Sequence, residues 1–147
     1  MSDRFDEGVV AEVAKSMILG VRAGGGPHRF TGVWAVVVEG RVFVRSWGVT
    51  PGGWFDTFVK EPRGTMQIGK REIPVRAIRT RSERLKDAVE AAYAAKYHTK
   101  ASQKWVRGFR APKRRDATIE LVPAESQPAA RRPAGRRLAG RRDGGCD

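Results

Sequence analysis

The stretch VWAVVVEGRVFVRSW, residues 33–47, decides the fold of this 147-residue chain. It opens with a continuous run of apolar, mostly β-branched residues, and such residues favour a strand. Glu39 and Gly40 then supply a two-residue turn, and residues 41–47 form a second strand. The stretch therefore predicts a β-hairpin whose first strand is buried on both faces.

The second strand of this hairpin presents two different faces, because alternate residues of a strand point to opposite sides. One face carries Val42, Val44 and Ser46, and the other carries Arg41, Phe43, Arg45 and Trp47. A tight turn at 39–40 places residue 34 roughly opposite residue 45. We therefore expect residues 29–34 and 45–50 to gather at one end of the hairpin.

The sequence on either side predicts a second hairpin and several helices. The spacing of the apolar residues distinguishes the strands from the helices. We expect a helix at 5–15, a strand at 16–22, a loop at 23–30, a helix that begins at Thr50–Pro51 and ends at Pro62, strands at 65–68 and 73–79, a helix at 82–99 and a closing strand at 118–122. Residues 100–116 are basic and are predicted to be irregular. The fold class is mainly β with flanking helices (α+β), with an antiparallel sheet of about six strands.

The chain changes character after residue 122. Residues 123–147 are rich in Arg, Gly, Ala and Pro and contain one large apolar side chain, Leu138. Such a segment cannot offset the entropy of ordering its backbone, so we predict a folded domain at 1–122 and a disordered Arg-rich tail at 123–147. The net charge of +13, from 29 basic and 16 acidic residues, favours polyanions, phosphorylated small molecules or anionic membranes as partners.

Several functional classes find no support in the sequence. The single cysteine, Cys146, excludes a disulfide or Cys-type zinc site within one chain, and His28 and His98 lack neighbours at metal-ligand spacing. We therefore predict no metal site. No catalytic serine elbow or phosphate-binding glycine fingerprint is present. The charged start and the absence of a long apolar run predict a cytoplasmic protein with no membrane partner.

One segment, residues 45–54, has the composition of an anion site. Arg45, Ser46 and Trp47 end the predicted strand. A glycine-rich turn begins at Gly48, and a helix follows near Trp54. Free N–H groups at a helix start bind anions, glycines let a phosphate approach, and arginine adds bidentate contacts. The alternative is that Arg45 is a solvated edge residue and that both tryptophans belong to the core.

A second candidate is the loop that leads into the first strand. It carries Arg22, His28, Arg29 and Thr31, and the strand after it holds Trp34. Because of the hairpin register, Arg29, Thr31 and Trp34 should lie near the 45–47 segment. The alternative is a mobile, solvated loop. In the helix at 82–99, Tyr93, Lys96 and Tyr97 either pack the helix on the sheet or reach a pocket.

These motifs together resemble a known bacterial family. The hairpin VWAVVVEGRVFVRSWG, the following GGWF, the strand REIPVRAI, the helix segment AVEAAYAAKY and the closing ATIELVP occur in this order in the domain of unknown function 2255. The resemblance covers roughly residues 5–122. It also extends to the flavin-binding split-barrel superfamily, whose members include pyridoxamine-phosphate-oxidase-like proteins and deazaflavin-dependent nitroreductases.

The resemblance implies an antiparallel split β-barrel that binds FMN or a deazaflavin. The phosphate of such a cofactor would be held by residues at the strand ends, here Arg45, Ser46, Trp47 and Gly48 together with Arg29 and Thr31. Trp47 or Trp54 would pack near the ring, and Trp34 belongs to the same expected cofactor-binding set. The resemblance also implies that two copies of the chain can pair as a homodimer.

We therefore expect a flavin- or deazaflavin-binding protein that acts as an oxidoreductase through cofactor hydride transfer. The alternative function is a non-enzymatic module that binds nucleic acid or another polyanion through its basic surface and its Arg-rich tail. A third alternative is a barrel that lacks the cofactor and serves as an interaction scaffold.

Overall fold

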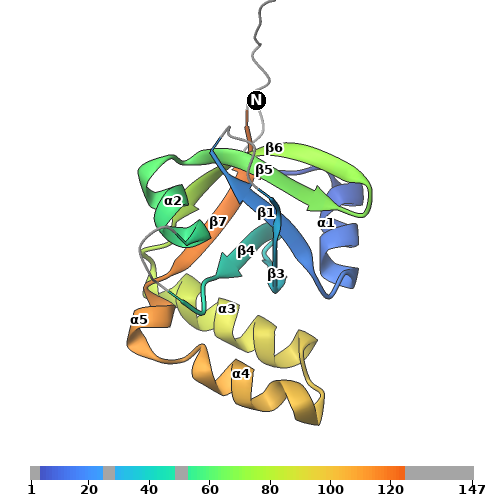
Figure 1. The fold of residues 1–147 in the computed structure, drawn as a ribbon. Coiled ribbons are helices and arrows are strands. Elements are labelled where there is room, and N and C mark those ends of the chain that lie inside the picture. Colours follow the sequence, from blue (N-terminus) through green and yellow to red (C-terminus); the bar gives the residue numbers. More distant parts are fainter. Residues whose placement is uncertain (1–3, 25–28, 49–52, 125–147) are drawn as a thin grey trace, which may run out of the picture.

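A computed structural model describes residues 4–24, 29–48 and 53–124, and these form one antiparallel seven-stranded sheet that curls into a nearly closed barrel (Figure 1). The strands are β1 (Leu19–Ala23), β2 (Thr31–Val33), β3 (Ala35–Val38), β4 (Arg41–Arg45), β5 (Arg63–Ile68), β6 (Arg71–Arg79) and β7 (Thr118–Pro123). Their order in the sheet is β2-β1-β5-β6-β7-β4-β3. The predicted mainly β, antiparallel fold with flanking helices is confirmed.

The barrel is brought close to closure by a bend at Trp34. The predicted single strand at 33–38 is wrong, since the structure divides this part of the chain into β2 and β3. β2 pairs with β1, whereas β3 pairs with β4 on the other side. The backbone carbonyl of Trp34 accepts a 2.5 Å hydrogen bond from the Tyr93 hydroxyl. The two edges of the sheet are therefore joined through one residue of the chain.

The first hairpin has the register that its turn predicts. Ala35 lies opposite Val44, and Val38 lies opposite Arg41. The two turn residues have positive φ angles, 56° at Glu39 and 72° at Gly40. This left-handed geometry matches the twist of the adjoining strands. Residues 32–34 lie beside residues 45–48 at this end of the hairpin, as expected, whereas Arg29 and Thr31 lie beside β1.

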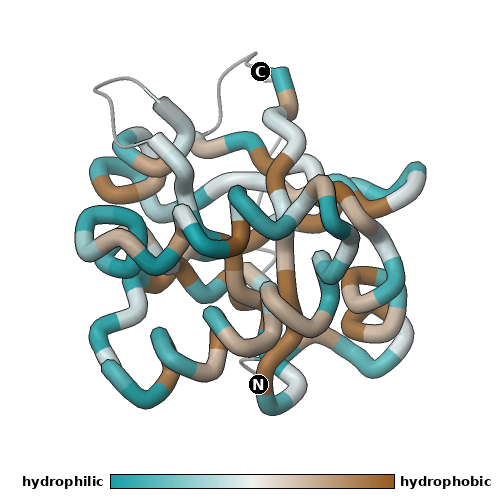
Figure 2. The backbone as a smooth tube through the Cα atoms, turned by 90° about the horizontal axis from the view of Figure 1, so that it is seen from below, coloured by the Kyte–Doolittle hydropathy of each residue, from teal (hydrophilic) through white to brown (hydrophobic). Residues whose placement is uncertain are grey.

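Two hydrophobic clusters cover the two faces of the sheet. Val42 and Val44 lie in the barrel interior, while Phe43 points outward into a second cluster. The strand β3 contributes to both clusters, because Ala35 packs inside and Val36 packs outside. The prediction that this strand is buried on both faces is confirmed. Figure 2, viewed from the α3–α4 side, shows hydrophobic stretches running through the centre and hydrophilic ones at the periphery.

The helices flank the barrel rather than lining it. They are α1 (Glu7–Lys15), α2 (Trp54–Lys60), α3 (Glu83–Lys96), η1 (Lys100–Ser102), α4 (Gln103–Gly108) and α5 (Pro112–Arg115). α3 begins as predicted, because the Ser82 hydroxyl accepts a hydrogen bond from the Leu85 N–H. α3 and α4 lie together on one side of the barrel, at the bottom of Figure 1. They supply the second hydrophobic cluster, which includes Tyr93, Val106 and Phe109.

The sequence-based prediction fails at two helices. Residues 100–116 are not irregular but contain η1, α4 and α5, because Val106 and Phe109 bury one side of α4 and Pro112 starts α5. α2 begins at Trp54, with Gly53 as its N-cap and no capping side chain. The predicted start at Thr50–Pro51 lies outside the described residues, as does the predicted tail beyond Ala124.

Replacing Tyr93 by Phe should destabilise the fold through the Trp34 bend. The Tyr93 hydroxyl donates to Trp34 O and accepts from the Arg45 N–H at 3.0 Å, so the variant leaves two buried backbone groups without a partner. We expect a loss of about 1–3 kcal/mol in the free energy of unfolding, measured by urea denaturation. Tyr97→Phe is the matched control, because its hydroxyl donates to Met17 O at 2.7 Å and not to the Trp34 bend. An equal loss of unfolding free energy in both variants would contradict the inference that the hydrogen bond to Trp34 O stabilises the bend.

Candidate functional site

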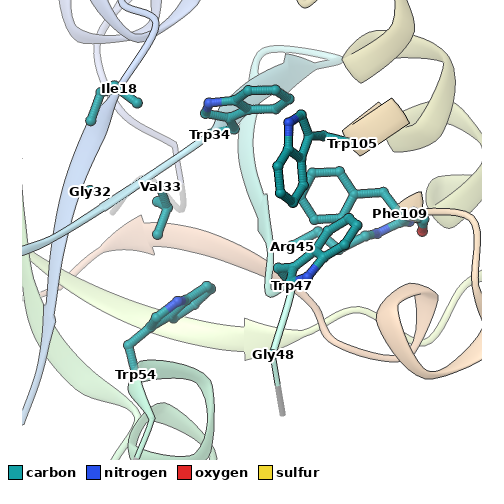
Figure 3. A pocket seen from close by; sticks show the side chains of 10 residues that line it. All are labelled: Ile18, Gly32, Val33, Trp34, Arg45, Trp47, Gly48, Trp54, Trp105 and Phe109. Carbon is teal, nitrogen blue, oxygen red and sulfur yellow. The ribbon is translucent and has the colours of Figure 1, made fainter. Parts of the chain in front are cut away.

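All four tryptophans of the chain line one pocket beside the Trp34 bend. The pocket has a volume of about 350 Å³ and lies between the bend, the end of β4, α2 and α4 (Figure 3). Its lining residues are Ile18, Gly32, Val33, Trp34, Arg45, Trp47, Gly48, Trp54, Trp105 and Phe109. This volume is at the lower end of the range for small-molecule sites, and aromatic lining is typical of them.

The Trp34 side of the pocket is held by Tyr93 of α3, by Tyr97 at its C-terminal cap and by Phe109 just after α4. The indole of Trp34 stacks on the Tyr97 ring with 4.0 Å between centroids and 4° between planes. Its backbone carbonyl is fixed by Tyr93, as described above. Phe109 meets the same indole edge-on at 6.4 Å. These contacts hold Trp34 before any ligand arrives, which lowers the entropy cost of binding.

The opposite wall is an aromatic cluster with a cation. Trp47 meets Trp105 edge-on at 4.9 Å and Phe109 at 5.6 Å. The guanidinium of Arg114 lies 3.5 Å from the centre of the Trp47 ring, and its Nε donates to Trp47 O at 3.0 Å. Stacked guanidinium and indole planes attract each other. The Trp47 ring is thereby fixed although 39% of this residue is exposed.

A second, polar hollow adjoins the pocket at Trp54. It has a volume of about 220 Å³ and is lined by Val21, Arg22, Ala23, Arg29, Thr31, Trp54 and Thr57. Trp54 is the residue common to both hollows. Arg29 is exposed, and Arg22 lies over the Phe30 ring at 4.5 Å. Two cations and a hydroxyl thus lie next to an apolar aromatic pocket.

Arg45 has internal partners. Its Nε donates to the Thr118 hydroxyl at 2.7 Å, Nη1 donates to the Glu90 carboxylate and Phe109 O, and Nη2 donates to Lys86 O. The side chain has no exposed surface, and burial lowers the pKa of Arg45 while the Glu90 charge opposes that shift. The guanidinium thus supports the pocket floor, and we leave Arg45 out of the phosphate-binding set proposed below.

The predicted site residues fall into three groups. Trp34, Arg45, Trp47, Gly48 and Trp54 line the tryptophan pocket, and Arg29 and Thr31 line the neighbouring hollow. Ser46 is buried, and its hydroxyl donates to the Gly48 carbonyl. The bend at Trp34 explains this grouping, because β2 leaves the hairpin there and pairs with β1, so that Thr31 lies opposite Val21 and lines the neighbouring hollow with Arg22.

Sequence reasoning missed the wall that α4 supplies. Trp105 and Phe109 stand four residues apart, which is helical spacing, but the surrounding basic residues favoured an irregular segment. Ile18 and Val33 also line the pocket, and no local pattern distinguishes them from core residues.

The lining of the tryptophan pocket includes no Asp, Glu, His or Lys side chain among the described residues. Among these residues, no group of three His, Cys, Asp or Glu side chains could hold a metal ion. The two tyrosine hydroxyls behind the pocket are bonded to backbone groups, and burial raises the pKa of both. None of the helices in the described ranges is both long and apolar enough to span a bilayer. The pocket can therefore accept an aromatic ring, and the hollow can accept an anion.

Comparisons with known proteins identify a family and a similar fold. Residues 10–121 match the family described as "Uncharacterized protein conserved in bacteria (DUF2255)". No curated protein matches the chain. Among solved structures, the chain is similar to the conserved hypothetical protein Rv2991 from Mycobacterium tuberculosis, with a TM-score of 0.51 and 15% identity, over 84% of this chain and 83% of that one. At this identity the likeness concerns the fold alone.

Gly108→Ala should displace Trp47 and reshape the pocket without unfolding the protein. A Cβ at Gly108 would overlap the far end of the Trp47 indole, which must therefore move. Alanine suits a helix better than glycine, so the helix itself loses nothing. We expect altered tryptophan fluorescence and near-UV circular dichroism together with a lower unfolding midpoint, because the displaced ring loses contacts with Arg114, Trp105 and Phe109. Gly48→Ala is the control, because its Cβ would meet nothing within 4 Å; equal spectral changes in both variants would contradict this packing.

The stability of the fold should fall steeply in alkali, in part through Tyr97. Burial raises the pKa of Tyr97 to about 12, whereas an unfolded tyrosine ionises near pH 10. Between these values the unfolded state loses its proton first, so the free energy of unfolding decreases as pH rises, by about 1.4 kcal/mol per pH unit for one tyrosine. The stability difference between wild type and Tyr97→Phe should therefore shrink over pH 10–12, as measured by urea denaturation. A constant difference would contradict the shift.

Proposed function

The chain belongs to the DUF2255 family of bacterial proteins, and we propose that it binds a flavin-type cofactor, FMN or a deazaflavin, in the tryptophan pocket. The observation that carries this proposal is the pairing of two adjoining hollows. One is aromatic and is lined by every tryptophan of the chain, and the other carries Arg22, Arg29 and Thr31. A ligand with a planar ring and a phosphate needs both.

The residues fit such a ligand in the following way. The ring would lie among the tryptophans, between the Trp34 wall and Trp54. The phosphate would lie in the polar hollow, where Arg29 and Arg22 supply charge and Thr31 supplies a hydroxyl. Trp54 would contact both parts, because it lines both hollows. This assignment moves the phosphate from Arg45 to the arginines of the 22–31 segment.

The proposed activity is that of an oxidoreductase. A bound flavin or deazaflavin supplies hydride transfer, so the protein need only hold the cofactor and shield its ring from water. The fixed indoles of Trp34 and Trp47 suit that role. The resemblance of the sequence to flavin-binding split-barrel proteins supports the same proposal, and we propose that the barrel belongs to that superfamily.

Titration of the tryptophan fluorescence with FMN and with a reduced deazaflavin tests the proposal. All four tryptophans line the pocket, so a bound ring should quench the emission strongly. We expect saturation in the micromolar range for at least one of the two cofactors. Trp54→Ala should weaken binding about tenfold by removing a ring contact, which is a loss of about 1.4 kcal/mol. No saturation by either cofactor at tens of micromolar overturns the proposal.

Riboflavin has no phosphate, so comparing it with FMN distinguishes the contribution of the polar hollow from that of the tryptophan pocket. Arg29→Gln should weaken FMN binding about tenfold, because a charged hydrogen bond contributes about 1.5–3 kcal/mol, and should leave riboflavin binding unchanged. Lys70→Gln is the matched control, since this exposed cation lies in the β5–β6 turn. If Arg29→Gln affects both ligands equally, the phosphate assignment is wrong.

A further inference from the structure

The segment that joins α3 to β7 carries a concentrated positive charge beside two exposed tryptophans. Residues 98–115 contain seven Lys or Arg and no Asp or Glu. Three of these cations, Lys104, Arg107 and Arg110, are exposed on or just after α4. None of the three has an acidic partner within the described residues, in contrast to Arg115, which pairs with Glu83, Asp87 and Glu90.

The tryptophans of this surface are accessible. Trp105 is 42% exposed and Trp47 is 39% exposed, and their rings meet edge-on. The Lys104 ammonium lies 5.1 Å from the centre of the Trp105 ring. Exposed cations next to an accessible indole ring are the two elements of a surface that binds single strands: phosphates contact the cations, and bases stack on the ring.

We propose that this α4 surface, made of Trp47, Trp105, Lys104, Arg107 and Arg110, binds single-stranded nucleic acid. The proposal goes beyond cofactor binding, because the three cations line neither the tryptophan pocket nor the polar hollow. The phosphate backbone would run along the exposed cations, and a base would stack against Trp105, whose ring Trp47 supports edge-on. Such contacts do not distinguish one base from another, so the affinity should depend little on the nucleotide sequence.

The structure favours nucleic acid over a lipid surface. A helix that lies on a membrane needs an apolar face turned to the lipid. The apolar residues of α4 and its end, Val106 and Phe109, are instead buried against α3. Trp105 is thus the exposed large apolar side chain of α4. On α4 itself one exposed indole among cations suits base stacking better than insertion into acyl chains.

The test compares two charge variants of the full-length protein. Lys104→Gln/Arg107→Gln/Arg110→Gln removes the α4 cations. Lys70→Gln/Arg76→Gln/Arg81→Gln removes the same number and types of exposed cation from β6 and its flanking turns. The long-range effect of the lost charge is the same in both, so any difference between them is local. The probe is a fluorescein-labelled oligothymidylate of about twelve nucleotides, followed by anisotropy.

We expect the α4 variant to bind the oligothymidylate at least about tenfold more weakly than the control variant. Each phosphate contact to a single strand contributes about 0.7 to the slope of log affinity against log salt, so the slope should fall by about 2. Trp105→Ala should weaken binding about tenfold even at high salt, because stacking does not depend on counterions. FMN binding should stay unchanged in the α4 variant, which separates this proposal from the previous one.

Three results would overturn the proposal. One is an equal loss of affinity in the two charge variants, which would show that only net charge matters. Another is unchanged affinity in Trp105→Ala, which would remove the stacking contribution. The third is that phosphatidylserine vesicles bind the protein and the oligothymidylate does not, which would identify the surface as lipid-binding.

Discussion

The hydroxyl of Tyr93 is the group on which the arrangement of the barrel depends. It donates to the carbonyl of Trp34 and accepts from the amide of Arg45, two backbone groups at the same end of the first hairpin. At Trp34 the chain leaves its pairing with β1 and begins its pairing with β4. A backbone group at such a crossing has no strand neighbour, and a buried group without a partner is costly. Tyr93, from α3, satisfies it.

The same bend produces the pocket. A strand that continued straight would keep its side chains in register with one neighbour, whereas the bend separates Val33 from Ala35 and leaves Trp34 between two pairings. The Trp34 indole then stacks on Tyr97, one helical turn beyond Tyr93. α3 therefore fixes both the backbone and the side chain of Trp34. The residue that closes the barrel and the residue that forms one pocket wall are the same, so a ligand in the pocket should stabilise the closure.

The sequence predicts the features of this fold that depend on neighbouring residues. The 39–40 turn, the alternation of β4 and the Ser82 cap of α3 are local patterns, and the structure confirms them. The Trp34 bend could not be predicted, because its hydrogen-bond partner stands 59 residues away. α4 was missed for a related reason. Its basic residues obscured a short helical pattern that becomes stable only when Val106 and Phe109 pack against α3.

The positions of the arginines show why net charge alone is a poor guide to an anion site. Arg45 comes from the motif that most resembles a phosphate-binding element, yet its donors are bonded to Thr118, Glu90 and backbone carbonyls. A phosphate would have to replace these bonds and leave Glu90 with a less complete set of partners. Arg29, Lys104, Arg107 and Arg110 are exposed, so an anion can reach them without that cost. The binding capacity of this chain therefore follows from which guanidinium and ammonium groups the fold leaves open, and these lie on either side of the tryptophan pocket.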